Sequence, residues 1–215
     1  MHDIDPRELP IVGGHLALDF ANTVDDPEGP ARHDHVATYD GLLAWSVRVR
    51  LLGTRAARSL ADQAEASPRS AAAALRRAHA LRDALNDAFG AIARGRPVAI
   101  DTWTALRPFA VEALADADLG RDHHLGWSFD DLRSPLHPVA TAAVDLLRSE
   151  QVGRVKQCAG CPWLFLDGSR NGSRRWCSME DCGTHQKITR YVARRAELRL
   201  RSREARAPEA VTSRR

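Results

Sequence analysis

The chain has 215 residues, of which 44% are hydrophobic and 27% are charged. This composition is sufficient for a packed core and excludes a chain that is disordered throughout. No apolar run approaches the roughly 18 residues that cross a membrane, and the polar start MHDIDPRELP does not read as a targeting signal. We therefore expect a cytoplasmic protein without a membrane partner.

The net charge of +3 hides a division along the chain. Residues 154–215 contain 15 Lys and Arg and 6 Asp and Glu, a net charge of +9, whereas residues 1–153 carry a net charge of −6. A basic segment behind an acidic body favours a polyanionic partner, and charge alone does not distinguish DNA from RNA.

The first predicted element is a strand within residues 14–24, where Leu16, Leu18 and Phe20 alternate with small or polar residues. Its expected antiparallel partner is a second alternating stretch, residues 125–129, which together would give a small sheet. Asp19 and Asn22 are candidates for ligand binding. The alternative is that both side chains anchor the loop that follows, by hydrogen bonds to its backbone.

This first stretch also resembles a known family. The run Gly-Gly-x-Leu-Ala-Leu-Asp-Phe-Ala-Asn-Thr-Val, which begins at Gly13, is similar to the opening of the ABATE domain. That domain is assigned to stress-induced transcription regulation and commonly precedes a CGNR-type zinc finger. The resemblance implies a regulator.

Between these strands and the cysteines, the sequence predicts a helical body. Apolar residues recur every three or four positions in residues 41–52, 54–66, 69–94, 102–115 and 136–148. The fourth of these helices is expected to bury Trp103, Leu106 and Leu114. Arg82 interrupts the apolar face of the third, which predicts a side chain that reaches out to solvent.

All four cysteines lie in one short segment, as Cys158-x2-Cys161 and Cys177-x4-Cys182 separated by fifteen residues. Two close pairs around a hairpin can bring four thiolates to one zinc ion, which would be structural because no coordination position stays open. Two disulfides are the alternative, but nothing indicates an oxidising compartment. We predict a hairpin with strands at residues 163–166 and 174–176, and positive φ at the Asn171-Gly172 turn.

Residues 161–179 closely resemble the CGNR-type zinc finger. The matching run is Cys-Pro-Trp-Leu-Phe-Leu-Asp-x-Ser-Arg-Asn-Gly-Ser-Arg-Arg-Trp-Cys-Ser-Met, followed by Cys182-Gly183 and a basic stretch. The chain departs from the family tetrad because Thr184 and His185 replace its Asn and Arg. The resemblance implies one zinc held by all four cysteines.

Together these patterns predict an α+β protein with three parts. Residues 1–150 form a helix-rich domain with a small antiparallel sheet that folds by itself. Residues 154–206 form a treble-clef-like zinc finger whose basic helix begins at His185, and residues 207–215 form a disordered tail.

The predicted function is that of a DNA-binding transcription regulator with an N-terminal domain that senses a signal or dimerises, so a homodimer is one expected arrangement. The candidate nucleic-acid contacts are the basic residues of the hairpin and helix, namely Arg170, Arg174, Arg175, Lys187, Arg190, Arg194 and Arg195. The alternatives are an RNA- or protein-interaction module, or an enzyme with a pocket near Asp19 and Asn22. No catalytic motif is found, so we expect no enzyme.

Overall fold

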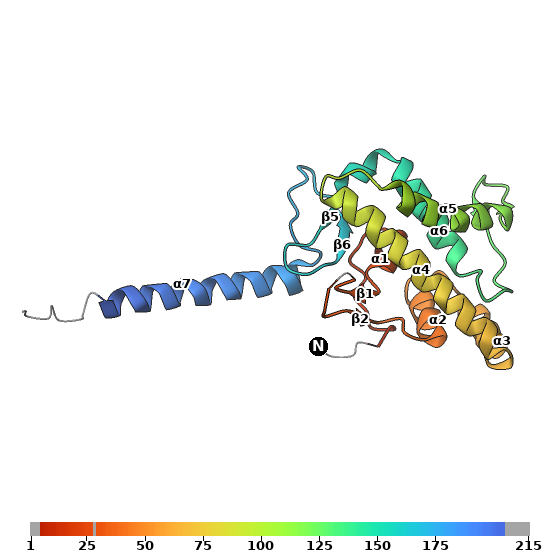
Figure 1. Cartoon of the computed structure of the whole chain (residues 1–215), viewed down its shortest axis with the longest axis horizontal. Coiled ribbons are helices and arrows are strands. Elements are labelled where there is room, and N and C mark those ends of the chain that lie inside the picture. The colour runs from red at the N-terminus through yellow and green to blue at the C-terminus, as the bar shows by residue number, and fades with distance from the viewer. Residues whose placement is uncertain (1–4, 28, 205–215) are drawn as a thin grey trace, which may run out of the picture. The chain divides into compact units, whose positions relative to one another are not determined.

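The structure, a computed structural model, describes residues 5–27 and 29–204. Within these residues the chain forms seven α-helices and three two-stranded antiparallel sheets (Figure 1), which confirms the helix-rich α+β class. The chain divides into two compact units, the first ending at Cys177 and the second beginning at Ser178. The predicted tail, residues 207–215, lies outside the described residues.

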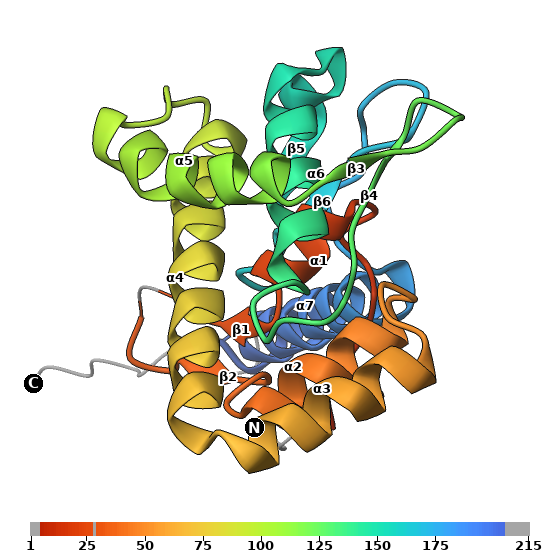
Figure 2. The same cartoon turned by 90° about the vertical axis from the view of Figure 1, so that its right-hand side faces the viewer.

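Five helices make up most of the first unit. They are α2 (Tyr39–Arg48), α3 (Thr54–Ala66), α4 (Pro68–Ala93), α5 (Ile100–Ala115) and α6 (Leu136–Arg148). The longest, α4, packs against each of the other four (Figure 2). All five were predicted with similar bounds, because each has an apolar face at helical spacing.

The predicted first strand is wrong: residues Leu16–Ala21 form a short helix, α1. Residues Ala17 to Ala21 are all buried, and α1 packs against both α4 and α6. A helix covered on every side shows no 3.6-residue pattern, and the alternation of large and small residues here imitates a strand.

The predicted pairing of residues 125–129 with the first stretch is also wrong. Strand β4 (Leu125–Gly126) pairs instead with β3 (Asp118–Leu119), directly after α5. A separate short hairpin joins β1 (Val24–Asp25) to β2 (His33–Asp34). Both hairpins connect neighbouring segments, so the single sheet expected from two distant strands does not form.

Arg82 does not reach out to solvent as predicted. Its side chain is only 1% exposed, and its two terminal nitrogens each lie 2.6 Å from a carboxylate oxygen of Asp34. Burying a charge in this way requires a paired, hydrogen-bonded partner, and Asp34 supplies it in bidentate geometry. The ion pair ties β2 to the middle of α4.

The prediction for α5 is correct in part. Leu106, Phe109 and Ala113 are buried against the bundle, whereas Trp103 and Leu114 are exposed. Helix α5 therefore packs on the bundle through fewer residues than the sequence suggests, and other apolar residues stay exposed to solvent.

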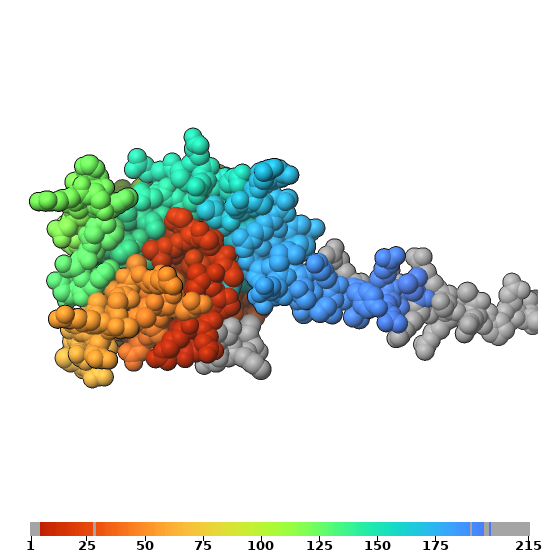
Figure 3. Space-filling model, turned by 180° about the vertical axis from the view of Figure 1, so that it is seen from behind, coloured from red at the N-terminus to blue at the C-terminus, as the bar shows by residue number. Residues whose placement is uncertain are grey.

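The end of the first unit is a hairpin that belongs to the same core as the helices. After the 3-10 turn η1 (Glu150–Arg154), strand β5 (Val155–Gln157) pairs with β6 (Leu164–Leu166), and residues 174–176 do not form the predicted return strand. Val155 and Leu164 are part of the main hydrophobic core. The surface around α1 and β1, in red, adjoins the blue surface of this segment (Figure 3). The compact unit therefore extends past the expected boundary at residue 150.

The second unit contains a single turn of π-helix, η2 (Met179–Gly183), followed by α7 (Thr184–Glu204). Ser178 caps this turn, because its hydroxyl accepts a hydrogen bond from the Asp181 amide at 3.1 Å. Helix α7 confirms the predicted basic helix.

None of the helices in the described part of the chain combines the length and the apolar character that a membrane crossing needs.

Candidate metal centre

The first two cysteines lie in the turn between β5 and β6. The Cys158 amide donates to the Trp163 carbonyl at 2.9 Å, which closes the turn that carries both cysteines. Two backbone amides, from Gly160 and Cys177, point at the Cys158 sulfur at 3.4 and 3.3 Å. Amides aimed at a sulfur stabilise it as a thiolate.

The four cysteine sulfurs form one cluster, in which all lie within 4.8 Å of one another. None of the four forms a disulfide. Sulfurs bound at about 2.3 Å to a tetrahedral zinc would lie about 3.8 Å apart. The cluster matches this spacing closely enough that small side-chain movements would complete it, so Cys158, Cys161, Cys177 and Cys182 fit one structural zinc ion.

The pKa values of two of the four sulfurs are shifted, in opposite directions. Burial by itself would raise the pKa of the Cys158 thiol, but the amides of Cys177 and Gly160 outweigh it and the pKa is lowered. The pKa of Cys161 is raised, chiefly by its contact with the Cys177 sulfur 3.5 Å away and also by burial. Sulfurs this close oppose one another's ionisation, and the two positive charges of a zinc ion would offset that repulsion.

A buried carboxylate organises the loop between Cys161 and Cys177. Asp167 is fully buried and accepts hydrogen bonds from the amide and hydroxyl of Ser169 and from the amide of Arg174. The Lys156 ammonium lies 2.7 Å from the same carboxylate. Burial would raise the pKa of Asp167, but these hydrogen bonds, with Lys156 first among them, lower it far below its usual range.

Lys156 also donates to the carbonyls of Gly172 and Arg174. One ammonium therefore joins Asp167, where the loop begins, to the residues at its far end. Gly172 has φ +58°, which confirms the predicted positive φ there. Sequence reasoning did not identify Lys156 and Asp167 as scaffold residues. The available signal was that Lys156 is one of only two lysines in an arginine-rich chain.

Arg174, predicted to contact nucleic acid, is engaged inside the protein. Its guanidinium donates to the Trp176 carbonyl at 2.9 Å and to the Cys177 carbonyl, and it lies 4.6 Å from the centre of the Phe165 ring. These contacts fix the backbone at the third cysteine.

Two further contacts fasten the hairpin to the N-terminal part of the same unit. The side-chain amide of Asn22 bonds to both backbone polar groups of Leu164. The Trp163 indole donates to Asp25, whose other oxygen lies 3.0 Å from the fully buried His35 ring. The hydrogen bonds from His35 and Trp163 outweigh burial, so the pKa of Asp25 is lowered.

Asp19, the other residue predicted to bind a ligand, is 7% exposed and accepts a hydrogen bond from the Gly13 amide at 2.7 Å. Burial raises its pKa to about 6, against the lowering effect of the Gly13 and Val12 amides. Both side chains bond to backbone, as the anchoring alternative expects, but their partners are Gly13 and Leu164 and not the loop that follows.

The remaining candidate contacts are surface residues. The exposed ones are Arg170, Arg175, Lys187, Arg194 and Arg195. The guanidinium of Arg175 lies over the Trp176 ring, and that of Arg195 donates to the Tyr191 hydroxyl. The Arg190 side chain lies outside the described residues.

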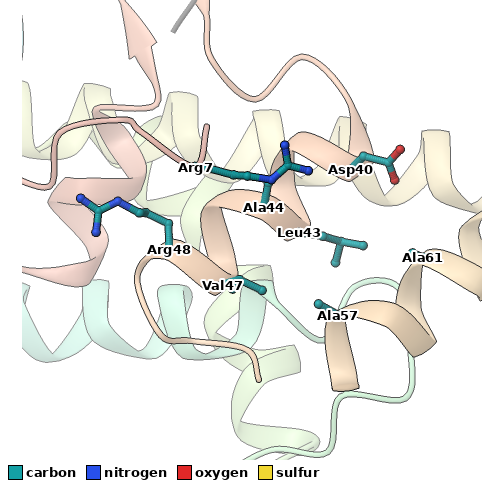
Figure 4. A pocket seen from close by; sticks show the side chains of 8 residues that line it. All are labelled: Arg7, Asp40, Leu43, Ala44, Val47, Arg48, Ala57 and Ala61. Atoms are coloured by element: carbon teal, nitrogen blue, oxygen red, sulfur yellow. The ribbon is translucent and has the colours of Figure 1, made fainter. Parts of the chain in front are cut away.

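A separate cavity of about 510 Å³ lies between α2 and α3. Leu43, Ala57 and Ala61 face its interior, the Arg7 guanidinium lies at its edge and Arg48 points away from them (Figure 4). Neither Asp19 nor Asn22 lines it.

The comparisons with known proteins agree with this architecture. Residues 14–150 match the model of the ABATE family, described as "Putative stress-induced transcription regulator", and residues 154–195 match the CGNR zinc finger. No curated protein matches the chain. The first match covers more than half of the sequence, and the four clustered cysteines lie within the second. The chain therefore belongs to the ABATE family and carries a CGNR zinc finger.

Proposed function

We propose that this protein is a zinc-dependent DNA-binding regulator of transcription that grips duplex DNA through the basic residues of its finger. The observation that carries the proposal is the charge of residues 154–215, +9 against −6 in the rest of the chain. In the described part of this segment, Arg170, Arg175, Lys187, Arg194 and Arg195 are exposed. Exposed cations on an ordered scaffold are the footprint of a phosphate-binding surface.

The metal site supports the proposal because two of its ligands, Cys161 and Cys177, bound the loop that presents two of these cations. Arg170 and Arg175 follow the second cysteine and precede the third, on a loop fixed by Asp167 and Lys156. Phosphate contacts give affinity without sequence information, so base reading would need a few well-placed side chains. Arg175 is the better candidate than Arg174, whose guanidinium is engaged with backbone carbonyls.

The test is a titration of the zinc-loaded full chain with duplex DNA at several salt concentrations. Five phosphate contacts predict a slope of log affinity against log salt of about −4.5. Arg175→Ala/Lys187→Ala should weaken binding and flatten the slope by nearly 2. Arg55→Ala/Arg76→Ala removes two exposed arginines from the first 150 residues and should change neither. Binding that ignores salt and the finger variants would refute the proposal.

An RNA- or protein-interaction module is the second candidate. The observation in its favour is the set of exposed apolar residues among the cations of α7, Ile188, Tyr191, Val192 and Leu198. A purely phosphate-binding helix has no need of these residues. Competition between duplex DNA and structured RNA in the same titration separates the two nucleic acids.

We also propose that the protein is not an enzyme. Four thiolate ligands leave zinc no open position for a water molecule. The N-terminal domain would act as the sensing part, and the cavity between α2 and α3 is a better place for an effector than the surroundings of Asp19 and Asn22. The cytoplasmic location expected from the sequence stays a prediction.

A further inference from the structure

Helix α5 carries an apolar face that none of the described residues of the first unit covers. Ile100, Trp103, Val111 and Leu114 are 81%, 40%, 60% and 65% exposed. Their spacing of three, eight and three residues places all four on one side of the helix. Leu106, Phe109 and Ala113, on a separate side of the helix, are the residues that α5 buries.

Single exposed apolar residues are ordinary, but a stripe along four turns of helix is not. Helix α5 lies across the end of α4 at the edge of the bundle (Figure 2) and packs on α4 and α6. The stripe is therefore on a firmly held helix, where an apolar face exposed to water is costly unless a partner covers it.

We propose that this stripe is the surface through which two copies of the chain pair, with their α5 helices antiparallel across a two-fold axis at Arg107. The positions of the apolar residues are symmetric about Arg107. Ile100 and Leu114 each lie seven residues from it, and Trp103 and Val111 each lie four residues from it. In a two-fold interface, a residue that contacts a second residue of the partner is matched by the reverse contact. Ile100 would meet Leu114 of the second copy, and Trp103 would meet Val111.

The charges at the two ends of α5 agree with an antiparallel pair. The exposed Arg96 lies shortly before the helix, and the exposed Asp118 lies shortly after it. These residues are also equally distant from Arg107, so the basic end of one copy would approach the acidic end of the other. Antiparallel helices also place opposite ends of their dipoles side by side.

Arg107 itself would stand beside its own counterpart at the axis. Its long stem can cover apolar surface while the guanidinium turns to the rim, where it can stack on the Trp103 ring of the second copy. Like charges at the axis nevertheless oppose pairing. A 16-residue helix is about 24 Å long, so the interface would fall near the lower limit of stable ones, about 1,200 Å² in total. We expect a dissociation constant in the micromolar range.

The experiment measures the mass of the zinc-loaded full chain by sedimentation velocity between about 1 and 200 μM. The wild type should shift from monomer to dimer across this range. Leu114→Asp should weaken pairing at least tenfold without changing the secondary structure, and Ile100→Asp, at an even more exposed position, should do the same if the first variant folds poorly. Ile188→Asp, on the exposed apolar face of α7, is the matched control and should leave pairing unchanged.

A charge swap tests the position of the axis. Arg107→Glu mixed with wild type should form mixed dimers in preference to either parent, because Arg then faces Glu. A monomer at every concentration would overturn the proposal, as would pairing that is lost only in Ile188→Asp. Dimers without this preference for mixing would overturn the axis at Arg107. The proposal does not depend on DNA binding, so the sedimentation experiment can detect dimers even if the DNA titration detects no binding.

Discussion

The side chain of Asn22 acts as a strand partner for Leu164. Its nitrogen donates to the Leu164 carbonyl and its oxygen accepts from the Leu164 amide, both at 2.8 Å. Both residues are buried, at 2% exposure each. One amide thereby satisfies a backbone donor and a backbone acceptor of β6, next to the first cysteine pair.

We predict that Asn22→Ala destabilises the protein by about 2–4 kcal/mol, because two buried backbone groups lose their partners. Asn22→Asp should be nearly as harmful, since a carboxylate cannot donate to the Leu164 carbonyl. Denaturant unfolding measures both changes. Asn86→Ala, which removes a half-buried amide bonded to the Ala21 carbonyl, serves as the control and should cost less. Equal costs at the two positions would contradict the assigned role of Asn22.

Asp19 should make stability depend on pH in an unusual direction. Its pKa is raised from 3.8 to about 6 by burial, so between these values the folded state holds a proton that the unfolded state has lost. The contribution of this carboxyl to stability is therefore complete below pH 4 and is lost as the pH rises to about 6. The difference corresponds to about 3 kcal/mol.

The test compares wild type with Asp19→Asn from pH 4 to pH 7. The amide oxygen can still accept from the Gly13 amide, but the variant cannot ionise. Stability of the variant relative to wild type should rise across this window, and protonation of the zinc ligands cancels in the comparison. A difference that does not change with pH would show that Asp19 has an ordinary pKa.

The parts of the fold that the sequence predicts well are those with a local pattern. Helix α4 has its apolar positions, its Pro68 start and its Gly95 stop within one segment, and the four cysteines carry their own spacing. Helix α1 is not predicted, because burial on all sides removes the 3.6-residue apolar pattern that identifies a helix. The pairing of β6 with β5 is not predicted because β5 is short and has no alternating pattern. It contains one buried apolar residue, Val155, and Lys156, whose hydrogen-bond partners lie up to 18 residues away.

The candidate site shows the same limit. The metal ligands follow from residue type and spacing, but the difference between Arg174 and its neighbour Arg175 depends on Phe165 and on the backbone near Cys177. A sequence presents the two as equivalent cations. Tertiary contacts make one a scaffold residue and leave the other on the surface.

This difference gives a prediction for two adjacent variants. Arg174→Ala should lower the stability by about 1–3 kcal/mol and promote loss of zinc, because the carbonyl of Cys177 loses a charged donor. Arg175→Ala should leave stability and zinc content unchanged and weaken DNA binding alone. Thermal unfolding, metal analysis and DNA titration on the same preparations separate these effects. Loss of stability and zinc in Arg175→Ala, with neither effect in Arg174→Ala, would contradict the assignment and make Arg175 the structural residue.

Truncation after Glu150 is predicted to prevent cooperative folding, contrary to the sequence-based expectation of an independent domain. The cut removes Val155 and Leu164 from the main core and leaves the buried Asn22 without its partner. Burial of two aliphatic side chains of this size stabilises a protein by about 3–6 kcal/mol, much of the total for a small domain. A chain ending after Cys177 keeps these contacts and should melt with a single transition, even without zinc. A sharp two-state transition in the shorter chain would show that α1 and α4 close over the exposed core without β5 and β6.

The zinc prediction distinguishes the ion's effect from that of the hydrophobic core. Metal analysis should give one zinc per chain, and Cys177→Ser should lose it, because three thiolates and a neutral hydroxyl form a much weaker site. Val155 and Leu164 belong to the main hydrophobic core, which contains none of the four cysteines. We therefore expect chelation to leave the helical spectrum of α2 to α6 largely intact while the segment from Asp167 to Gly183 loses protection in hydrogen exchange. Protection in α4 provides the internal control. Complete unfolding on chelation would show that the zinc site, and not the shared core, holds the first unit together.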